Sequence, residues 1–180
     1  MTGAPAIVRS EREQDLVRWG DEVLVPLYDR DGSIADYTLI DVADLAFVLC
    51  WRWHLSNGYA ARSARPASTG HVLLHRELLG LVPGDGQEGD HRNRNKLDNT
   101  RENLRSGAHS QNMQNLASYR GGSSSLRGVD WAARLGKWRA RIRVAGKLKH
   151  LGYFNSEEAA GACASAARAQ LHPFSEDATA

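Results

Sequence analysis

Residues 89–115 hold the side chains of this chain that are best suited to chemistry, beginning with the adjacent pair Asp90 and His91. Neighbouring residues on a strand point to opposite faces, so these two side chains can serve different partners. Asn112 and Asn115 are three residues apart, which places them on one face of a helix. Carboxylate and carboxamide oxygens suit Mg²⁺ better than Zn²⁺, and a neutral histidine near such a metal can accept a proton from water. The alternative interpretation is a polar loop with an incidental histidine.

The segment KWRARIRV, residues 137–144, alternates strictly between two kinds of side chain. Arg139, Arg141 and Arg143 fall on one face of a strand, and the apolar residues fall on the other. The three arginines span about 14 Å, and arginine is the residue type that binds phosphate and guanine with two parallel hydrogen bonds. The alternative is a solvated sheet face, although three like charges on one bare face need a counter-anion.

The whole chain has 180 residues, is 42% hydrophobic and 24% charged, and can therefore bury a core. Its net charge of +2 is unevenly distributed, because residues 1–48 carry net −6 and residues 121–150 carry net +7. A basic block of this density favours a polyanion partner, most commonly nucleic acid. We expect no transmembrane helix, no secretory signal and no disulfide partner for Cys50 or Cys163, which together favour a reducing, cytoplasmic location.

The elements that must position these residues fall into two parts. In the first part, Asp31-Gly32 predicts a hairpin, residues 41–55 a short helix, and Asn57-Gly58 a turn. Residues 83–118 are too polar to make a core of their own, so they form either a long loop or a site held by something other than burial, such as a metal. The Gly/Ser-rich segment 119–125 is the clearest linker.

The second part predicts three short strands and a helix. The strands are expected around Gly128–Trp131, Lys137–Val144 and Lys147–Gly152, and the helix from Glu157 to about Gln170 with Asn155 or Ser156 as its cap. Alternation leaves the third strand open, since either Lys147 and Lys149 or Leu148 and His150 point outward, with the second pair favoured. We expect Trp138, Tyr153 and Phe154 in the core.

The polar segment resembles the HNH endonuclease family in its phage and intron-encoded homing branch. The residues that carry the resemblance extend in register over about 40 positions: His75-Arg76, Asp90-His91, Leu97-Asp98-Asn99, Asn103-Leu104-Arg105, Asn112 and Asn115. The resemblance implies a ββα-metal fold, with one strand bearing Asp90 and His91, a second strand near Leu104–Gly107, and a helix bearing Asn112.

It also implies a division of roles. Asp90 and Asn112 bind one divalent cation, Mg²⁺ or Mn²⁺, which stabilises the charge that develops on the phosphate. His91 is the general base that activates the attacking water, and Asn103 ties the loop together and orients His91. Two positions depart from the family pattern or compete with it: Ala108 stands where a helix-capping threonine is expected, and His109 is a rival metal ligand to Asn112.

Two further residues match a family element upstream. His75 either touches the DNA backbone or supports the site, and Arg76 is expected to contact DNA. Residues 21–82 also resemble the leading region of phage proteins that combine an HNH module with an ERF-type module.

Residues 126–171 resemble the APETALA/ethylene-response-factor (ERF) DNA-binding domain. The landmarks are Arg127-Gly128-Val129, Trp131, Gly136-Lys137-Trp138, Arg141-Ile142-Arg143, Leu151-Gly152-Tyr153-Phe154 and Glu157-Glu158-Ala159-Ala160. The family lays its sheet in the DNA major groove. The resemblance therefore implies that DNA is contacted by Arg127, Arg139, Arg141 and Arg143, with Lys137 and Lys149 nearer the phosphates.

Taken together, the sequence predicts an α+β chain in which a small β-rich segment and an HNH nuclease module precede a DNA-binding domain made of a three-stranded sheet and a helix. The expected divisions are a lead 1–20, the nuclease domain 21–118, the linker 119–125, the DNA-binding domain 126–174 and a tail 175–180. The expected function is metal-dependent, site-directed nicking of double-stranded DNA in a bacterial host cell by a monomer or homodimer. The alternative is a sequence-specific DNA-binding protein with an idle nuclease site.

Overall fold

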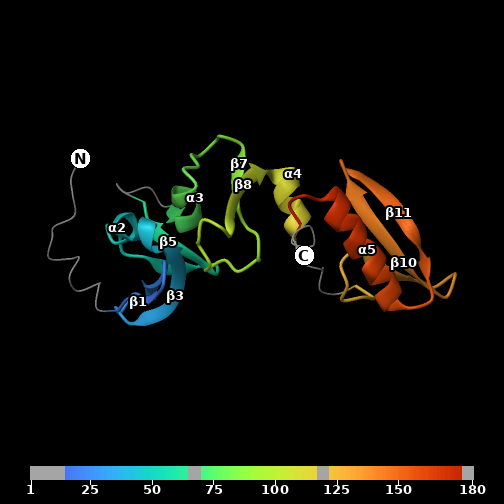
Figure 1. Ribbon diagram of the computed structural model, residues 1–180, viewed down its shortest axis with the longest axis horizontal. Helices are drawn as coiled ribbons and strands as arrows, with labels where there is room; N and C mark the ends of the chain where they lie inside the picture. The colour runs from blue at the N-terminus through green and yellow to red at the C-terminus, as the bar shows by residue number, and fades with distance from the viewer. Residues whose placement is uncertain (1–14, 65–69, 117–121, 176–180) are drawn as a thin grey trace. The chain divides into compact units, whose positions relative to one another are not determined.

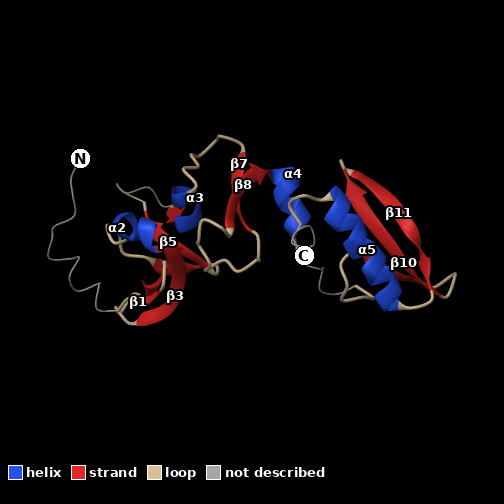
Figure 2. Cartoon of the chain, viewed as in Figure 1, coloured by secondary structure: helices blue, strands red, loops and turns tan. Residues whose placement is uncertain are grey.

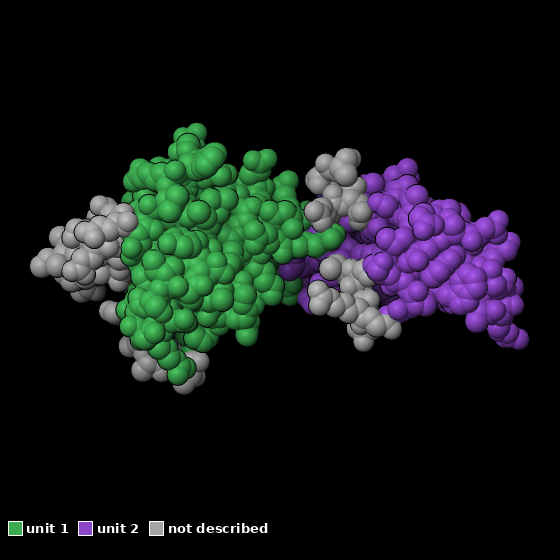
Figure 3. Space-filling model, turned by 90° about the horizontal axis from the view of Figure 1, so that it is seen from below, with its two compact units in different colours: residues 1–108 green, residues 109–180 purple. Residues whose placement is uncertain are grey.

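The computed structural model describes residues 15–64, 70–116 and 122–175. The protein is a mixed α+β chain with small antiparallel sheets and few helices, as expected (Figures 1 and 2). It divides into two compact units, residues 1–108 and 109–180 (Figure 3). The expected lead, linker and tail lie partly outside the described residues, so their boundaries stay predictions. No helix of the described part is long and apolar enough to cross a membrane, and neither Cys50 nor Cys163, both described, forms a disulfide.

The described residues of the first unit form three antiparallel sheets, with strand orders β1-β2-β3, β4-β5-β6 and β7-β8. Its elements, in chain order, are β1 (Val17–Trp19), β2 (Glu22–Tyr28), β3 (Ile34–Asp41), a 3-10 turn η1 (Val42–Asp44), α2 (Leu45–Val48), β4 (His54–Ser56), β5 (Tyr59–Ser63), β6 (His71–Leu73), α3 (Leu74–Leu78), β7 (Gln87–His91) and β8 (Leu104–Ala108).

The predicted turns of this unit are confirmed. β2 pairs with β3 across the loop that contains Asp31 and Gly32. Asn57 and Gly58 have φ values of 50° and 80°, the backbone that a two-residue hairpin between β4 and β5 requires. The helix predicted within residues 41–55 forms as α2 but is short. After Val48 the amides of Cys50 and Trp51 donate to carbonyl oxygens three residues back, in a tight turn that ends the helix.

One core serves the first unit. β2, β3, α2, α3 and β8 all contribute buried apolar side chains to it, and Trp53, in the segment between α2 and β4, is the largest side chain of this core. The Trp53 indole Nε1 donates to the Val48 carbonyl oxygen at 2.8 Å, which satisfies the one polar atom of this side chain. Leu104 on β8 belongs to the same core and attaches the β7–β8 hairpin to it.

The second unit carries a one-turn helix and the expected sheet-plus-helix. Its elements are α4 (His109–Asn112), a 3-10 turn η2 (Met113–Asn115), β9 (Val129–Ala132), β10 (Lys137–Val144), β11 (Lys147–Phe154) and α5 (Glu157–Leu171). The sheet order is β11-β10-β9, and α5 packs on it through Ala160 and Ala164 against Val129 and Ala140 (Figure 1). The Ser156 hydroxyl accepts from the Ala159 amide, so the expected cap is confirmed as Ser156.

Candidate active site and DNA-binding face

The strand β7 places Asp90 and His91 on opposite faces, as the sequence predicts. In the hairpin register, Asp90 pairs with Arg105 and His91 pairs with Leu104. The Arg105 guanidinium donates to Asp90 Oδ2 from Nε at 2.8 Å and from Nη2 at 2.6 Å, and both side chains are largely buried. Arg105 was missed as a site residue, although opposite charges directly across an antiparallel hairpin are a signal that register reasoning can find.

His91 points into the first unit and is only 5% exposed. Its Nε2 lies 3.3 Å from Asn99 Oδ1, and its ring meets the His75 ring edge-on with centroids 5.0 Å apart. Burial lowers the pKa of His91, and the bond to Asn99 and the Asp90 carboxylate offset this only in part. The ring is therefore neutral at pH 7, which is the form that can accept a proton.

His75, on α3, is also 5% exposed, and its ring packs against that of His91. Burial, followed by the neighbouring His91 and Arg76, lowers its pKa to about 3. The close approach of β7 to α3 depends on Gly89, because a Cβ at that position would lie 2.4 Å from His75 Cδ2. The Arg76 guanidinium donates to the carbonyl oxygens of Val82 and Gln87, both at 3.3 Å, and so holds the segment that leads into β7.

Asn103 ties together the loop between β7 and β8. Its Oδ1 accepts from the Asn93 amide at 2.9 Å and its Nδ2 donates to the Asp98 carbonyl oxygen at 2.7 Å. Asn99, four residues earlier, places its Oδ1 3.3 Å from the His91 ring nitrogen Nε2. Asn103 therefore acts on the conformation of the loop, and Asn99 acts on the ring itself.

The same loop is anchored to β3 of the amino-terminal sheet. Leu39 N donates to Leu97 O and Asn99 N donates to Leu39 O, both at 2.8 Å, in a parallel bridge. The Thr38 hydroxyl also donates to Leu97 O at 2.8 Å. Within this polar segment, residues 87–108 are therefore fixed by the pairing of β7 with β8 and by the bonds to β3.

Asn112 and His109, the two rival metal ligands, lie on α4 in the second unit. That helix has only one turn before it tightens into η2, in keeping with the absence of the capping threonine at Ala108. Asp90 belongs to the other unit, so its partnership with either residue stays a prediction. Across residues 15–64, 70–116 and 122–175, no group of three or more His, Cys, Asp or Glu side chains could hold a metal ion. A donor set of one carboxylate and one carboxamide oxygen nevertheless fits a hard cation such as Mg²⁺, which keeps several waters.

In the second unit, Arg139, Arg141 and Arg143 project from the face of β10 opposite to buried Ala140 and Ile142; we call this the arginine face. His150 and Leu148 of β11 lie directly across from Arg141 and Arg143, so the favoured alternative for the third strand is confirmed. Lys137 begins β10 and is exposed, and Lys149 is exposed opposite Ile142.

The expectation that Tyr153 belongs to the core is wrong. Tyr153 is 43% exposed and lies opposite Arg139 on the arginine face, with its ring 4.5 Å from that of His150. The reason is a bulge: Ala140 pairs with Gly152 and Arg141 with His150, which leaves Leu151 as an extra residue. One extra residue reverses the alternation after it, so that Tyr153 turns outward. Trp138 and Phe154 pack against the core as expected.

Asp130 supplies the counter-anion that the arginine face needs. Its carboxylate accepts from Arg139 at 2.6 Å and from Arg141 at 2.8 Å. Burial alone would raise the pKa of Asp130, but the bonds and charges of the two arginines outweigh it and lower the pKa. The two guanidinium groups are therefore held in fixed positions before any ligand arrives.

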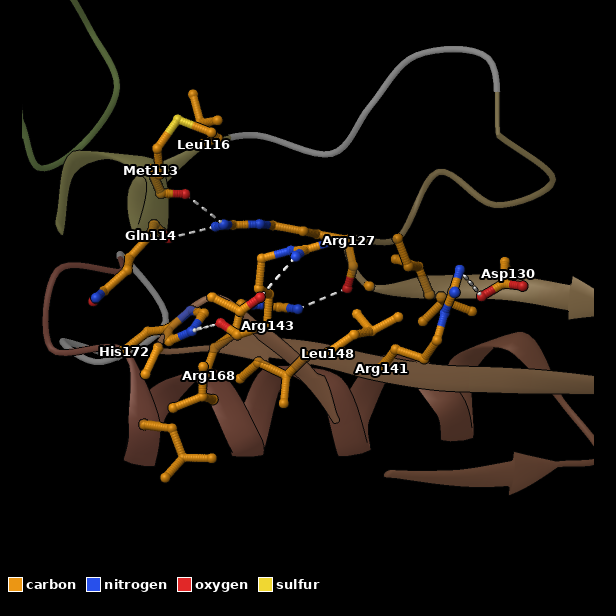
Figure 4. Close-up of a pocket in the computed structure, with 18 of the residues that line it drawn as sticks. Met113, Gln114, Leu116, Arg127, Asp130, Arg141, Arg143, Leu148, Arg168 and His172 are labelled. Carbon is orange, nitrogen blue, oxygen red and sulfur yellow. Dashed lines mark hydrogen bonds and ion pairs between the residues drawn. The ribbon is translucent and has the colours of Figure 1, made fainter. Parts of the chain in front are cut away.

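A cavity of about 950 Å³ lies within the second unit, between the η2 segment and the end of the β10–β11 hairpin. Figure 4 shows that the arginines that line it turn toward partners in the protein. The Arg127 guanidinium donates to the carbonyl oxygens of Gln114 and Met113 at 2.5 and 3.0 Å, and Arg168 donates to Arg127 O at 2.6 Å. Arg127, expected to contact DNA, is thus engaged in joining η2 to the sheet domain.

Comparison of the chain with protein-family models, with curated proteins and with solved structures finds no match.

Proposed function

We propose that this protein is a metal-dependent DNA endonuclease that nicks one strand, with a separate DNA-binding sheet in its second unit. One observation carries the proposal. His91, a buried and neutral histidine, and Asp90, a carboxylate, are adjacent in the sequence of one strand and point to its two faces. The Asn99 amide contacts His91, and the Arg105 guanidinium binds Asp90. A water activated by one and a cation bound by the other are the two requirements of phosphodiester hydrolysis at neutral pH.

In this mechanism His91 accepts the proton of the attacking water, and its neutral form at pH 7 is the competent one. Asp90 and Asn112 would hold Mg²⁺ or Mn²⁺, and the bound cation would supply positive charge against the negative charge of the reacting phosphate. Asn103 keeps the loop in the conformation that presents the ring. By the resemblance to HNH enzymes, the products carry 5′-phosphate and 3′-hydroxyl ends.

The DNA-binding part of the proposal is supported by the arginine face. Guanidinium groups on one side of a strand can contact base edges and phosphates of a groove. Asp130 holds Arg139 and Arg141 in place, which lowers the entropy that binding would otherwise cost. Tyr153 adds an exposed aromatic ring to the same face.

A second candidate function, DNA binding with an idle nuclease site, is favoured by the Asp90–Arg105 ion pair. Because Arg105 already balances the charge of Asp90, a cation would bind there less strongly than at an unbalanced carboxylate. The two candidates make opposite predictions for cleavage and the same prediction for DNA binding.

The deciding experiment is conversion of supercoiled plasmid to open circles with Mg²⁺ or Mn²⁺, with EDTA, and with the variant His91→Ala. We expect nicking by the wild-type protein that EDTA and His91→Ala both abolish. The variant His71→Ala, which removes an exposed histidine from β6, is the matched control and should nick normally. Plasmid binding in a gel-shift assay without nicking under either metal would favour the second candidate.

A further inference from the structure

Four polar groups form a continuous line from β3 to the His91 ring. The Thr38 hydroxyl donates to Leu97 O at 2.8 Å, Asn99 Nδ2 donates to Thr38 Oγ1 at 2.8 Å, and Asn99 Oδ1 lies 3.3 Å from His91 Nε2. Thr38 is 0% exposed and Asn99 is 1% exposed. We call these residues, Leu97, Thr38, Asn99 and His91, the Thr38 network.

The direction of every bond in the Thr38 network follows from its first member. Leu97 O is a carbonyl and can only accept, so the single hydroxyl proton of Thr38 points to it. Thr38 Oγ1 must then accept from Asn99, which requires the amide nitrogen of Asn99 on that side. The reversed amide would put two oxygens together with no proton between them, and it would also lose the longer contact of Nδ2 with Lys96 O.

This orientation leaves Asn99 Oδ1 facing His91, where an oxygen without a hydrogen can only accept. The neutral imidazole has one N–H, and here it must be on Nε2. The other nitrogen, Nδ1, is then unprotonated. A buried amide and a buried hydroxyl from another sheet thus select one of the two tautomers of the ring.

We propose that Asn99 and Thr38 are positioning residues that hold the neutral His91 ring in its Nε2–H tautomer. The expected effect of these residues on the cleavage rate rests on the proposed nuclease function, whereas the tautomer itself does not. The inference gives the amino-terminal sheet a specific chemical role, because the residue that sets the proton position comes from β3.

The test uses the full-length protein with ¹⁵N-labelled histidine, in which NMR distinguishes protonated from unprotonated ring nitrogens. We expect wild-type His91 to show a protonated Nε2 and an unprotonated Nδ1. Thr38→Val, which keeps the shape but removes the hydroxyl, should produce a mixture of tautomers, and Thr38→Ser should restore the wild-type pattern. Asn99→Leu should also produce a mixture, because it removes the acceptor.

The kinetic readout separates positioning from plain structural support. Thr38→Val should lower the single-turnover nicking rate by about 10- to 100-fold, the usual effect of removing an outer partner of a reactive group, and leave the Kd for DNA unchanged. Thr100→Val is the matched control, since Thr100 is a buried hydroxyl of the same loop that bonds Asp98 and lies outside the Thr38 network. It should alter neither the tautomer nor the rate.

A protonated Nδ1 in the wild-type protein would overturn the inference directly, even if no variant folds. A single Nε2–H tautomer that persists in both Thr38→Val and Asn99→Leu would overturn it as well. If the wild-type protein shows the expected tautomer but does not nick DNA, the nuclease proposal fails and the structural inference stands.

Discussion

The buried His75 should make the first unit sensitive to acid. Its pKa is lowered to about 3 in the folded protein from the ordinary 6.5, so below pH 6.5 the unfolded chain takes up a proton that the folded chain refuses. Stability is therefore complete above the unfolded pKa and falls as the pH drops from 6.5 toward 3. About pH 5 lies about 1.5 units below the pKa of His75 in the unfolded chain. At about 1.36 kcal/mol per unit, the unfolding free energy is about 2 kcal/mol lower there than at neutral pH.

The variant His75→Phe keeps a ring beside His91 and Tyr59 but cannot be protonated. Any packing change that it introduces is independent of pH, so the quantity to compare is the change in unfolding free energy between about pH 7.5 and about pH 5. We expect that change to be about 2 kcal/mol smaller in the variant than in the wild-type protein. Carboxylates with lowered pKa values, such as Asp130, lose their contribution only at lower pH and do not interfere.

The assay is urea unfolding followed by the indole N–H resonance of Trp53. That side chain is 1% exposed and bonds Val48 O, so its signal reports the first unit separately from the second. His150→Phe, at an exposed position of the other unit, is the control and should leave the Trp53 transition unchanged. Parallel pH profiles for the wild-type protein and His75→Phe would refute the reasoning, because they would mean that His75 is protonated in the folded state as easily as in the unfolded one.

Three further predictions concern packing, charge and capping. Gly89→Ala should destabilise the first unit by about 1–3 kcal/mol in urea unfolding, since its Cβ would meet the His75 ring at 2.4 Å; a neutral effect would mean that this ring can move aside. Asp130→Asn removes the carboxylate that holds its two arginine partners in place, so DNA binding in a gel-shift titration should weaken by about 1–3 kcal/mol, at about 0.5–1.5 kcal/mol for each side chain that must then be ordered; unchanged or tighter binding would show that Asp130 competes with DNA for these arginines instead. Ser156→Ala removes the acceptor of the Ala159 amide at the start of α5 and should lower the unfolding free energy of the second unit by about 1 kcal/mol. Unchanged thermal and urea midpoints would mean that water replaces the cap.

Local signals in the sequence predicted the second unit well. The alternation of residues 137–144, the turn residues and the capping serine each act over a few positions, so they can be read without knowledge of the fold. Tyr153 was misplaced because the bulge at Leu151 depends on how β11 pairs with β10, and pairing is a property of two strands.

The site shows a similar division. The opposite directions of Asp90 and His91 follow from strand geometry alone, and the structure has them. Arg105, Asn99 and Thr38 were not predicted as partners, because each contact depends on register or on a sheet about 60 residues away in the sequence. The ligand role of Asn112 cannot be derived locally either, since it depends on a residue of the other unit.

The parallel bridge between Leu39 and the loop before β8 has a consequence for protein engineering and for gene recombination. A β7–β8 hairpin transplanted into another scaffold would take Asp90, His91, Asn103 and Asn99 with it, but it would leave Thr38 and the backbone partners of β3 behind. A recombination junction placed anywhere between residues 42 and 86 divides the set in the same way. The smallest segment that keeps the geometry around His91 therefore extends from β3 to β8, and a transfer of the hairpin motif alone would carry its residues without that geometry.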